Sequence, residues 1–281
     1  MHFSTVEAVL EYEVKEPTHF CFNIEAAHWP TQKIVSERLE LSEHVVARCF
    51  EDPQFGHRLL RFDAPPGPLA LNYKADVQVL QHDDRVLEES PVREIPDEIF
   101  HYLLPSRYCE SDVLCAAAQK MFGDLQPGVS RVRKVVDWIR DNVTYRSGST
   151  NSMTTARDVF VQRAGVCRDF AHLGITFCRA LSIPARMVVG YVWFDEPPQD
   201  FHAIFEAWIG GRWVLFDPTG MAPADRLVRV GTGRDAKDVA FCTYFGNVVL
   251  KRKEVMVLEH DPRPAAAAVP PVQREAAEEA A

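Results

Sequence analysis

The stretch AGVCRDFAHLGITFCRALSIPARMVVGYV, from Ala164 to Val192, decides the fold of this chain. A helix that begins at Cys167 gathers its polar side chains in one wedge of the helical wheel, and apolar side chains fill the remaining arc of more than about 200°. Such a helix is mostly buried at the centre of a domain. The apolar run that follows Pro184 predicts a strand next to it in the chain.

Cys167 lies in the first turn of this predicted helix. Unpaired backbone N–H groups and the positive end of the helix dipole meet there, so a thiolate is stabilised and the pKa of a cysteine can fall well below its usual value of about 8.5. Cys178 lies three turns further on, within the same apolar arc but far from the dipole's positive end. The competing interpretation is a buried structural thiol, since cysteine is among the most buried residue types.

A predicted hairpin brings a histidine and an aspartate together. The segment HAIFEAWIGGRWVLFDP, which starts at His202, has the pattern of two strands joined by Gly210–Gly211. A two-residue loop pairs Trp208 with Trp213 and places His202 on the same sheet face as Asp217, as diagonal neighbours. The helical wheel, by contrast, directs His172 about 140° away from Cys167, so we predict a structural or surface role for it. We assume that the helix and the hairpin are adjacent, because the pattern does not establish it.

The sequence thus supplies a nucleophilic cysteine, a base and an orienting carboxylate, in the order Cys167, His202 and Asp217, which is the arrangement of an activated nucleophile. The composition is consistent with a globular enzyme, because 281 residues that are 47% hydrophobic can bury one large core or two modest ones. The net charge of −9 and the absence of a long basic cluster argue against nucleic-acid binding.

Location and cofactors are predicted from what the sequence lacks. It has no secretory signal and no apolar run as long as a membrane span, so we expect a cytoplasmic protein that does not associate with membranes. Its seven cysteines are scattered, with no C-x-x-C motif and no repeated Cys or His spacing. We therefore expect no disulfide framework, no metal and no other cofactor.

The chain divides into three predicted parts. Residues 1–100 form a β-rich domain of short alternating segments, residues 101–260 form the catalytic core, and 261–281 form a disordered tail rich in Ala, Pro and Glu. Within the core we predict helices over 112–122, capped by Ser111, and over 131–142, before the helix of Cys167. Strands then continue to residue 260.

Three motifs resemble the bacterial transglutaminase-like superfamily, some of whose members are described as cysteine proteases. They are RAGVCRDFAHLGITFCRALSIPARMVVGY, HAIFEAW and WVLFDPTG, and the resemblance extends over about 103–257. It implies an α+β fold: a papain-like core of helices packed on an antiparallel sheet, preceded by the sandwich-like β domain found in bacterial members. It also implies that Cys167 is the nucleophile, His202 the base and Asp217 the orienting carboxylate.

Two positions depart from the family pattern. Ile204 stands where the family commonly has Trp, and Ser182 stands where it usually has Gly. Neither position belongs to the triad. We expect the change at Ile204 to alter the substrate cleft.

The predicted activity is that of a cysteine peptidase or amidase, which acts on a peptide or protein amide through a thioester. The alternatives are a protein-glutamine transglutaminase or deamidase, or a non-catalytic binding module that retains the fold. The enzymatic alternatives share the attack of a thiolate on an acyl carbon and differ in whether water or an amine then attacks the thioester. We favour hydrolysis, because water is always present and a cross-linking enzyme in a bacterial cytoplasm would modify its own proteome. The sequence does not indicate an oligomeric state.

Overall fold

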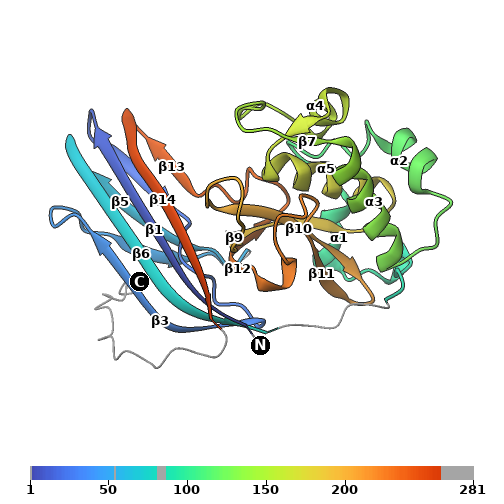
Figure 1. The fold of residues 1–281 in the computed structure, drawn as a ribbon, viewed down its shortest axis with the longest axis horizontal. Helices are drawn as coiled ribbons and strands as arrows, with labels where there is room; N and C mark the ends of the chain where they lie inside the picture. The colour runs from blue at the N-terminus through green and yellow to red at the C-terminus, as the bar shows by residue number, and fades with distance from the viewer. Residues whose placement is uncertain (1, 54, 81–86, 261–281) are drawn as a thin grey trace.

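The computed structural model of the protein describes residues 2–53, 55–80 and 87–260. The tail that we predict to be disordered, 261–281, lies outside these residues. The described chain forms a β-sandwich beside a core of helices and a separate sheet (Figure 1). No helix in the described ranges is both long enough and apolar enough to cross a membrane.

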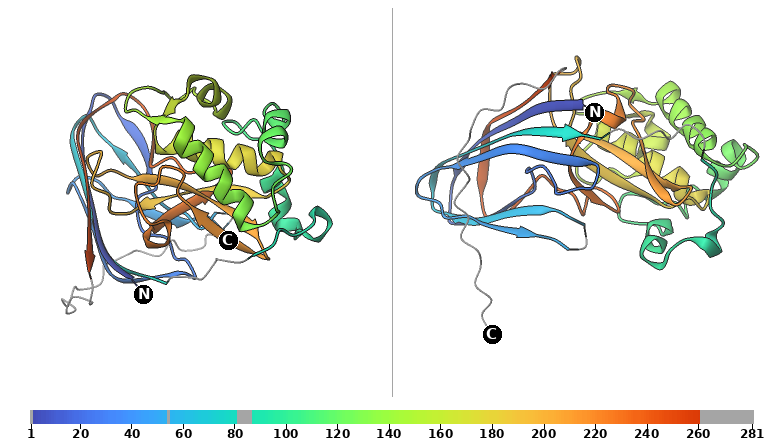
Figure 2. Two further views of the ribbon diagram at one scale, coloured as in Figure 1. Left: turned by 45° about the vertical axis from the view of Figure 1, so that its right-hand side comes forward. Right: turned by 90° about the horizontal axis from the view of Figure 1, so that it is seen from below.

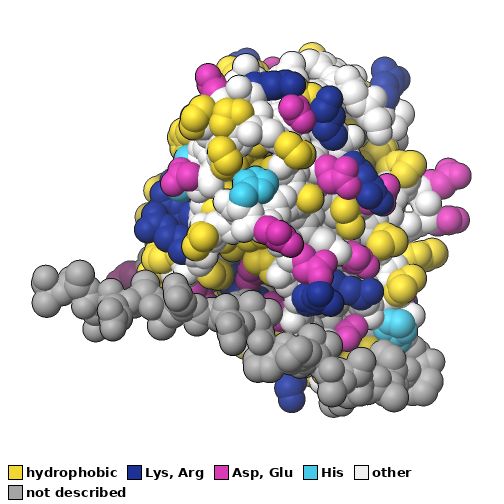
Figure 3. Space-filling view, turned by 90° about the vertical axis from the view of Figure 1, so that its left-hand side faces the viewer, with side chains coloured by type: hydrophobic (Ala, Val, Ile, Leu, Met, Phe, Trp, Pro, Cys, Tyr) yellow, Lys and Arg dark blue, Asp and Glu magenta, His cyan; other side chains and the backbone are white. Residues whose placement is uncertain are grey.

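Two four-stranded antiparallel sheets make the sandwich, in the orders β14-β1-β6-β3 and β13-β2-β5-β4. Along β1 buried and half-buried side chains alternate, so one face of the strand packs into the sandwich interior. Basic, acidic and apolar side chains are intermixed on the side of the sandwich that Figure 3 shows. The strands are β1 (His2–Val14), β2 (Thr18–Phe22), β3 (Gln32–Leu41), β4 (Arg48–Glu51), β5 (Arg58–Ala64), β6 (Gly67–Val79), β13 (Cys242–Phe245) and β14 (Val248–His260).

The last two strands correct our division of the chain. We assigned all residues from 101 to 260 to the core, but β13 pairs with β2 and β14 pairs with β1 over its whole length, from Phe3 opposite His260 to Val14 opposite Val248. The alternation of apolar residues identifies a strand without identifying its partner, which explains the error. The core is therefore inserted between β6 and β13 of the sandwich.

The core contains a four-stranded antiparallel sheet, in the order β11-β10-β9-β12, a two-stranded parallel sheet, β7-β8, and helices packed around the central helix α5. Figure 2 shows the helices on the side of the four-stranded sheet away from the sandwich. The α-helices are α1 (Asp97–Phe100), α2 (Cys115–Phe122), α3 (Val129–Asn142), α4 (Ala156–Gln162) and α5 (Cys167–Ala180). The strands are β7 (Thr144–Tyr145), β8 (Ala164–Gly165), β9 (Ala185–Tyr191), β10 (His202–Ile209), β11 (Arg212–Phe216) and β12 (Val228–Gly233).

Helix α5 packs directly on the sheet and is almost completely buried. The contact is close at Gly174, where a Cβ atom would lie 2.5 Å from the ring of Phe205 on β10. Only glycine allows the helix axis to approach the strand at this point. The prediction of a central buried helix that begins at Cys167 is confirmed.

The neighbouring helices agree less closely with the predictions. Helix α3 begins two residues before the predicted start, and α2 begins at Cys115 because residues 111–114 form a turn, so Ser111 is not its N-cap. Helix α4 was not predicted. The Asp158 carboxylate accepts a hydrogen bond of 3.0 Å from the backbone N–H of Thr155 and so caps its first turn.

Buried polar groups join the sandwich to the core sheet. The hydroxyl of Tyr191 on β9 donates to the carbonyl of Ile24 at 2.6 Å, and the N–H of Ala27 donates to the carbonyl of Arg229 on β12 at 2.8 Å. The Arg229 guanidinium also lies 4.5 Å from the ring centroid of Trp29. These contacts fix the connection between β2 and β3 of the sandwich against β12, the edge strand of the core sheet, and against Tyr191 on the neighbouring strand β9.

Candidate active site

Cys167 is the first residue of α5 and is only partly buried. The chain before it is held by Asp169, a fully buried residue at the third helical position. Its carboxylate accepts hydrogen bonds from the N–H of Val166 at 3.0 Å and from the hydroxyl of Thr150 at 2.5 Å. The capping role of Asp169 was not predicted, although an acidic residue at the third position of a helix is a recognised capping signal.

The β10–β11 hairpin has the predicted register. Trp208 pairs with Trp213, and the loop residues Gly210 and Gly211 have φ values of 61° and 78°, which suit a type I′ turn. Nε2 of His202 lies 3.0 Å from Oδ2 of Asp217, so the hydrogen bond that the register suggested is present.

Asp217 is held as a carboxylate by three further donors. Thr219 donates its backbone N–H at 2.9 Å and its hydroxyl at 2.7 Å to Oδ1, and the N–H of Ala222 donates to Oδ2 at 3.2 Å. Burial alone would raise the pKa of Asp217, but the hydrogen bond and charge of His202 together with the Thr219 donors lower it. The motif DPTG is thus a turn that orients the carboxylate toward the histidine.

His202 is 1% exposed. Burial lowers its pKa, but the hydrogen bond to Asp217 and the interactions with Cys167 outweigh burial and raise the pKa to about 10. Cys167 is close enough to the ring to contribute to this upward shift of the pKa. Because Nε2 bonds to Asp217, Nδ1 is the nitrogen left for the thiol. The structure therefore brings the three predicted site residues together around one imidazole.

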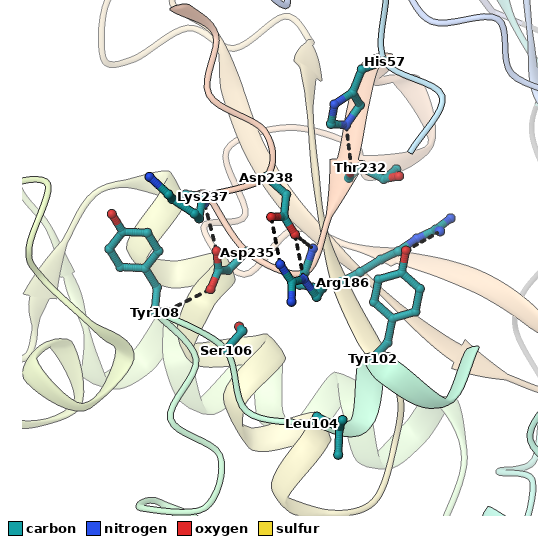
Figure 4. Close-up of polar contacts among 12 residues, drawn as sticks. His57, Tyr102, Leu104, Ser106, Tyr108, Arg186, Thr232, Asp235, Lys237 and Asp238 are labelled. Atoms are coloured by element: carbon teal, nitrogen blue, oxygen red, sulfur yellow. Dashed lines mark hydrogen bonds and ion pairs between the residues drawn. The ribbon is translucent and has the colours of Figure 1, made fainter. Parts of the chain in front are cut away.

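His172 lies elsewhere and is fully buried. Its ring stacks on Tyr108 with centroids 5.0 Å apart, and its Nε2 accepts a hydrogen bond of 3.1 Å from the N–H of Ala236. Burial lowers its pKa to about 3. The side of α5 that we predicted to be polar is buried because two segments cover it, one around Tyr108 and one around Ala236. Figure 4 shows them joined where Asp235 accepts from the N–H of Tyr108 at 2.9 Å.

Ile204 is only 1% exposed, so its side chain presents almost no surface to a substrate, contrary to the expectation for this position. It is buried in an apolar cluster with Val188, Val192, Phe194 and Leu227. Ser182 follows α5 with a φ of 64°, and the next N–H, of Ile183, donates to the carbonyl of Cys178 at 2.9 Å. This helix-ending turn is the reason glycine suits the position.

A cavity of about 970 Å³ opens between the sandwich and the core sheet, and its lining includes Trp29, Trp213 and Arg229. A second one, of about 440 Å³, is lined by Asp217 and by residues around Arg140. Neither is lined by Cys167 or His202, so the reacting atoms lie outside both. Within the described ranges, no group of three or more His, Cys, Asp or Glu side chains is placed to hold a metal ion.

Comparisons with known proteins give the family. Residues 116–218 match the model of the transglutaminase-like superfamily, and residues 1–98 match that of the bacterial transglutaminase N-terminal domain. The crystal structure of a "Putative Cysteine Protease" from Cytophaga hutchinsonii is 40% identical, with a TM-score of 0.88 over 96% of this chain and 94% of that one. The chain belongs to the transglutaminase-like superfamily. Its α+β fold is the one that the resemblance implied.

Curated relatives of this transglutaminase-like chain come from mycobacteria. An uncharacterized protein of Mycobacterium leprae is 32% identical over 155 residues, and one of Mycobacterium tuberculosis is 36% identical over 143 residues. The matches cover 54% and 46% of those proteins, so the chain spans about half the length of the curated relatives it matches.

Proposed function

We propose that this transglutaminase-like protein is a thiol-dependent acyl-transfer enzyme, a cysteine peptidase or amidase that uses Cys167, His202 and Asp217. One observation carries the proposal: the buried imidazole of His202 lies between the Asp217 carboxylate, at 3.0 Å, and the thiol at the start of α5. A purely structural histidine in this environment would be driven toward neutrality by burial, whereas His202 is held in the charged form.

In the first half of the reaction, the Cys167 thiolate attacks the carbonyl carbon of a peptide or protein amide. The C–S bond forms and the carbonyl π electrons move to oxygen, which gives a tetrahedral intermediate. This intermediate collapses when the C–N bond breaks and the His202 imidazolium gives its proton to the leaving amine. The product of this half-reaction is a thioester on Cys167.

In the second half, His202 takes a proton from water, and the oxygen attacks the thioester carbon. The C–S bond breaks, so the acid is released and the thiolate returns with a protonated imidazole. An amine in place of water would give a transglutaminase, and a glutamine side chain as substrate would give a deamidase. We place hydrolysis first because water is always present and a cross-linking enzyme in a bacterial cytoplasm would modify its own proteome. We take a cytoplasmic location as part of the same proposal.

The identity of the acceptor can be tested directly. The protein is incubated with a library of peptides and isopeptides, with and without a fluorescent primary amine, and the products are analysed by mass spectrometry. We expect hydrolysed amides with the wild type and with Cys115→Ala, which removes an exposed thiol elsewhere, and none with Cys167→Ala. Incorporated amine would favour the transglutaminase alternative. Binding without any chemical change in the wild type would favour the binding module.

The reactivity of the thiol can be tested without a substrate. We expect iodoacetamide to alkylate Cys167 near neutral pH while Cys178 and Cys109 stay unmodified, because both are fully buried and burial raises their pKa values, that of Cys109 to about 12. Peptide mapping after brief labelling gives the order in which the cysteines react. If Cys167 is spared while other native thiols react, it is not the nucleophile.

A further inference from the structure

Two arginines share one carboxylate at the wall of the larger cavity, the one of about 970 Å³. Oε1 of Glu206 on β10 accepts a hydrogen bond of 2.6 Å from Nε of Arg186 on β9. Arg229 on β12 donates to both carboxylate oxygens, at 3.0 Å to Oε1 and at 2.7 Å to Oε2. All three side chains are buried, and Glu206 and Arg229 line the cavity. We call these three residues the arginine cluster.

The arginine cluster carries a net positive charge. Burial raises the pKa of Glu206, but the charges and hydrogen bonds of Arg229 and Arg186 outweigh burial and lower it, so the carboxylate is ionised at neutral pH. A guanidinium stays charged in proteins. Two positive groups and one negative group leave one unbalanced positive charge, since no second carboxylate in the described part of the chain pairs with either arginine. Such a buried charge is costly unless an anion approaches it.

Aromatic rings lie beside this charge. The guanidinium of Arg186 is 4.0 Å from the ring centroid of Trp213, and that of Arg229 is 4.5 Å from the ring centroid of Trp29. The cavity lining contains three of the five tryptophans of the chain, all partly exposed: Trp29, Trp208 and Trp213. Flat apolar walls next to a positive charge suit a ligand that has a flat apolar body and an acid group.

The charged side chains that line the cavity also have a positive balance. They are three arginines and two carboxylates: Arg133, Arg212, Arg229, Glu206 and Asp225. We propose that the cavity binds a small organic anion, with its acid group on the arginine cluster and its flat apolar body against the tryptophans. The cavity lining includes neither Cys167 nor His202, so this binding site does not rest on the proposed function.

The proposal can be tested with two fluorescent probes that differ only by an acid group. 8-Anilinonaphthalene-1-sulfonate has a flat apolar body with one negative charge, and N-phenyl-1-naphthylamine is the same body without the sulfonate. Each probe is titrated into the full-length wild type, and its Kd is taken from the rise in fluorescence. We expect the sulfonate probe to bind one site per chain about tenfold or more tightly than the neutral probe. Equal affinities, or no saturable binding of the sulfonate probe, would overturn the proposal.

Two substitutions in the arginine cluster should change the affinity for the sulfonate probe in opposite directions. Arg229→Met keeps an apolar side chain against Trp29 but removes one positive charge, so the probe should bind about tenfold or more weakly. Glu206→Gln removes the carboxylate that competes for the arginines, so the probe should bind about tenfold more tightly. Arg252→Met on β14 is the matched control, because it removes the same charge from an exposed ion pair and should change neither affinity.

Two further results would contradict this inference. A change in the same direction in both cluster variants would mean that they act by loosening the structure, and an unchanged affinity in both would mean that the probe binds elsewhere. If a variant does not fold, the comparison of the two probes in the wild type still decides. Alkylation of Cys167 should leave the affinity for the sulfonate probe as it was. Loss of binding after alkylation would place the probe in the proposed active site, which would contradict this inference and leave the proposed function intact.

Discussion

His202 and His172 are both buried in the core, yet their surroundings favour different protonation states at neutral pH, the imidazolium for His202 and the neutral ring for His172. The pKa of His202 is raised to about 10, and that of His172 is lowered to about 3. Nε2 of His202 bonds to the Asp217 carboxylate, which favours a protonated nitrogen. Nε2 of His172 instead accepts a hydrogen bond from the N–H of Ala236, so this nitrogen must keep its lone pair. Burial is common to both residues, so the partner decides which form is stable.

The strongest test of this contrast is the loss of each imidazole in turn. We expect His202→Ala to lower kcat/KM by on the order of 10⁴-fold or more, and to move alkylation of Cys167 to higher pH because the imidazolium beside the thiolate is gone. His172→Phe keeps a ring to stack on Tyr108, so we expect activity within about threefold of the wild type. The measurements are initial rates and the pH dependence of alkylation. A shifted alkylation profile in His172→Phe would break the contrast.

The next test removes the charge that distinguishes the two sites. Asp217→Asn should lower turnover by about 10³- to 10⁴-fold, because an amide neither stabilises the imidazolium nor selects its tautomer. The melting temperature should stay within a few degrees. Thr219→Val is the matched control, since it removes the 2.7 Å hydrogen bond to Oδ1 and leaves Oδ2 on His202, and it should cost about tenfold or less. A collapsed fold with normal specific activity in the remaining fraction would make Asp217 structural.

The two histidines should also change the free energy of unfolding with pH in opposite directions. The folded pKa of His172 lies below the unfolded value of about 6.5, so its contribution is present above pH 6.5 and is lost as the pH falls toward 3. The folded pKa of His202 lies above that value, so its contribution is complete below pH 6.5 and is lost as the pH rises through 10. Each slope is at most about 1.4 kcal/mol per pH unit.

Urea midpoints from pH 4.5 to 10 measure these slopes. We expect His172→Phe to flatten the acid side of the curve only, and His202→Ala to flatten the alkaline side only. An acid slope that survives in His172→Phe would assign acid sensitivity to other groups.

The smallest expected effect comes from a position that touches neither histidine. Ser182 holds a φ of 64°, a conformation that glycine adopts without strain, so Ser182→Gly should stabilise the protein by about 0.5–1 kcal/mol. Activity and both pH slopes should be unchanged. This variant therefore serves as a control that changes stability alone, with which the other variants can be compared. Ser182→Ala keeps the strained backbone and should give no gain in the same urea titration.

The hairpin and the central helix could be predicted because each depends on local rules. Gly210 and Gly211 define a two-residue turn, and counting outward from the turn gives the register that makes His202 a diagonal neighbour of Asp217 on one sheet face. The helix of Cys167 follows from its apolar arc. Both features need no knowledge of distant parts of the chain.

What depends on distant segments could not be predicted. His172 lies on the polar side of the helical wheel, and its burial comes from Tyr108 and Ala236, which are 64 residues away on either side. The two arginines that pair with Glu206 lie on β9 and β12, so their meeting depends on how the strands of the core sheet pair. The strand that pairs with β14 could not be predicted either, because an alternating pattern fits any sheet with one buried face.

The pairing of β14 with β1 sets the order in which the protein can be completed during synthesis. Strand β1 is made before the core, but the neighbour that it needs along one edge, Val248–His260, leaves the ribosome only after the whole core. Until then β1 presents an open edge of thirteen residues. We expect this edge to stay unpaired while the core forms, and this sheet of the sandwich to be completed after the core.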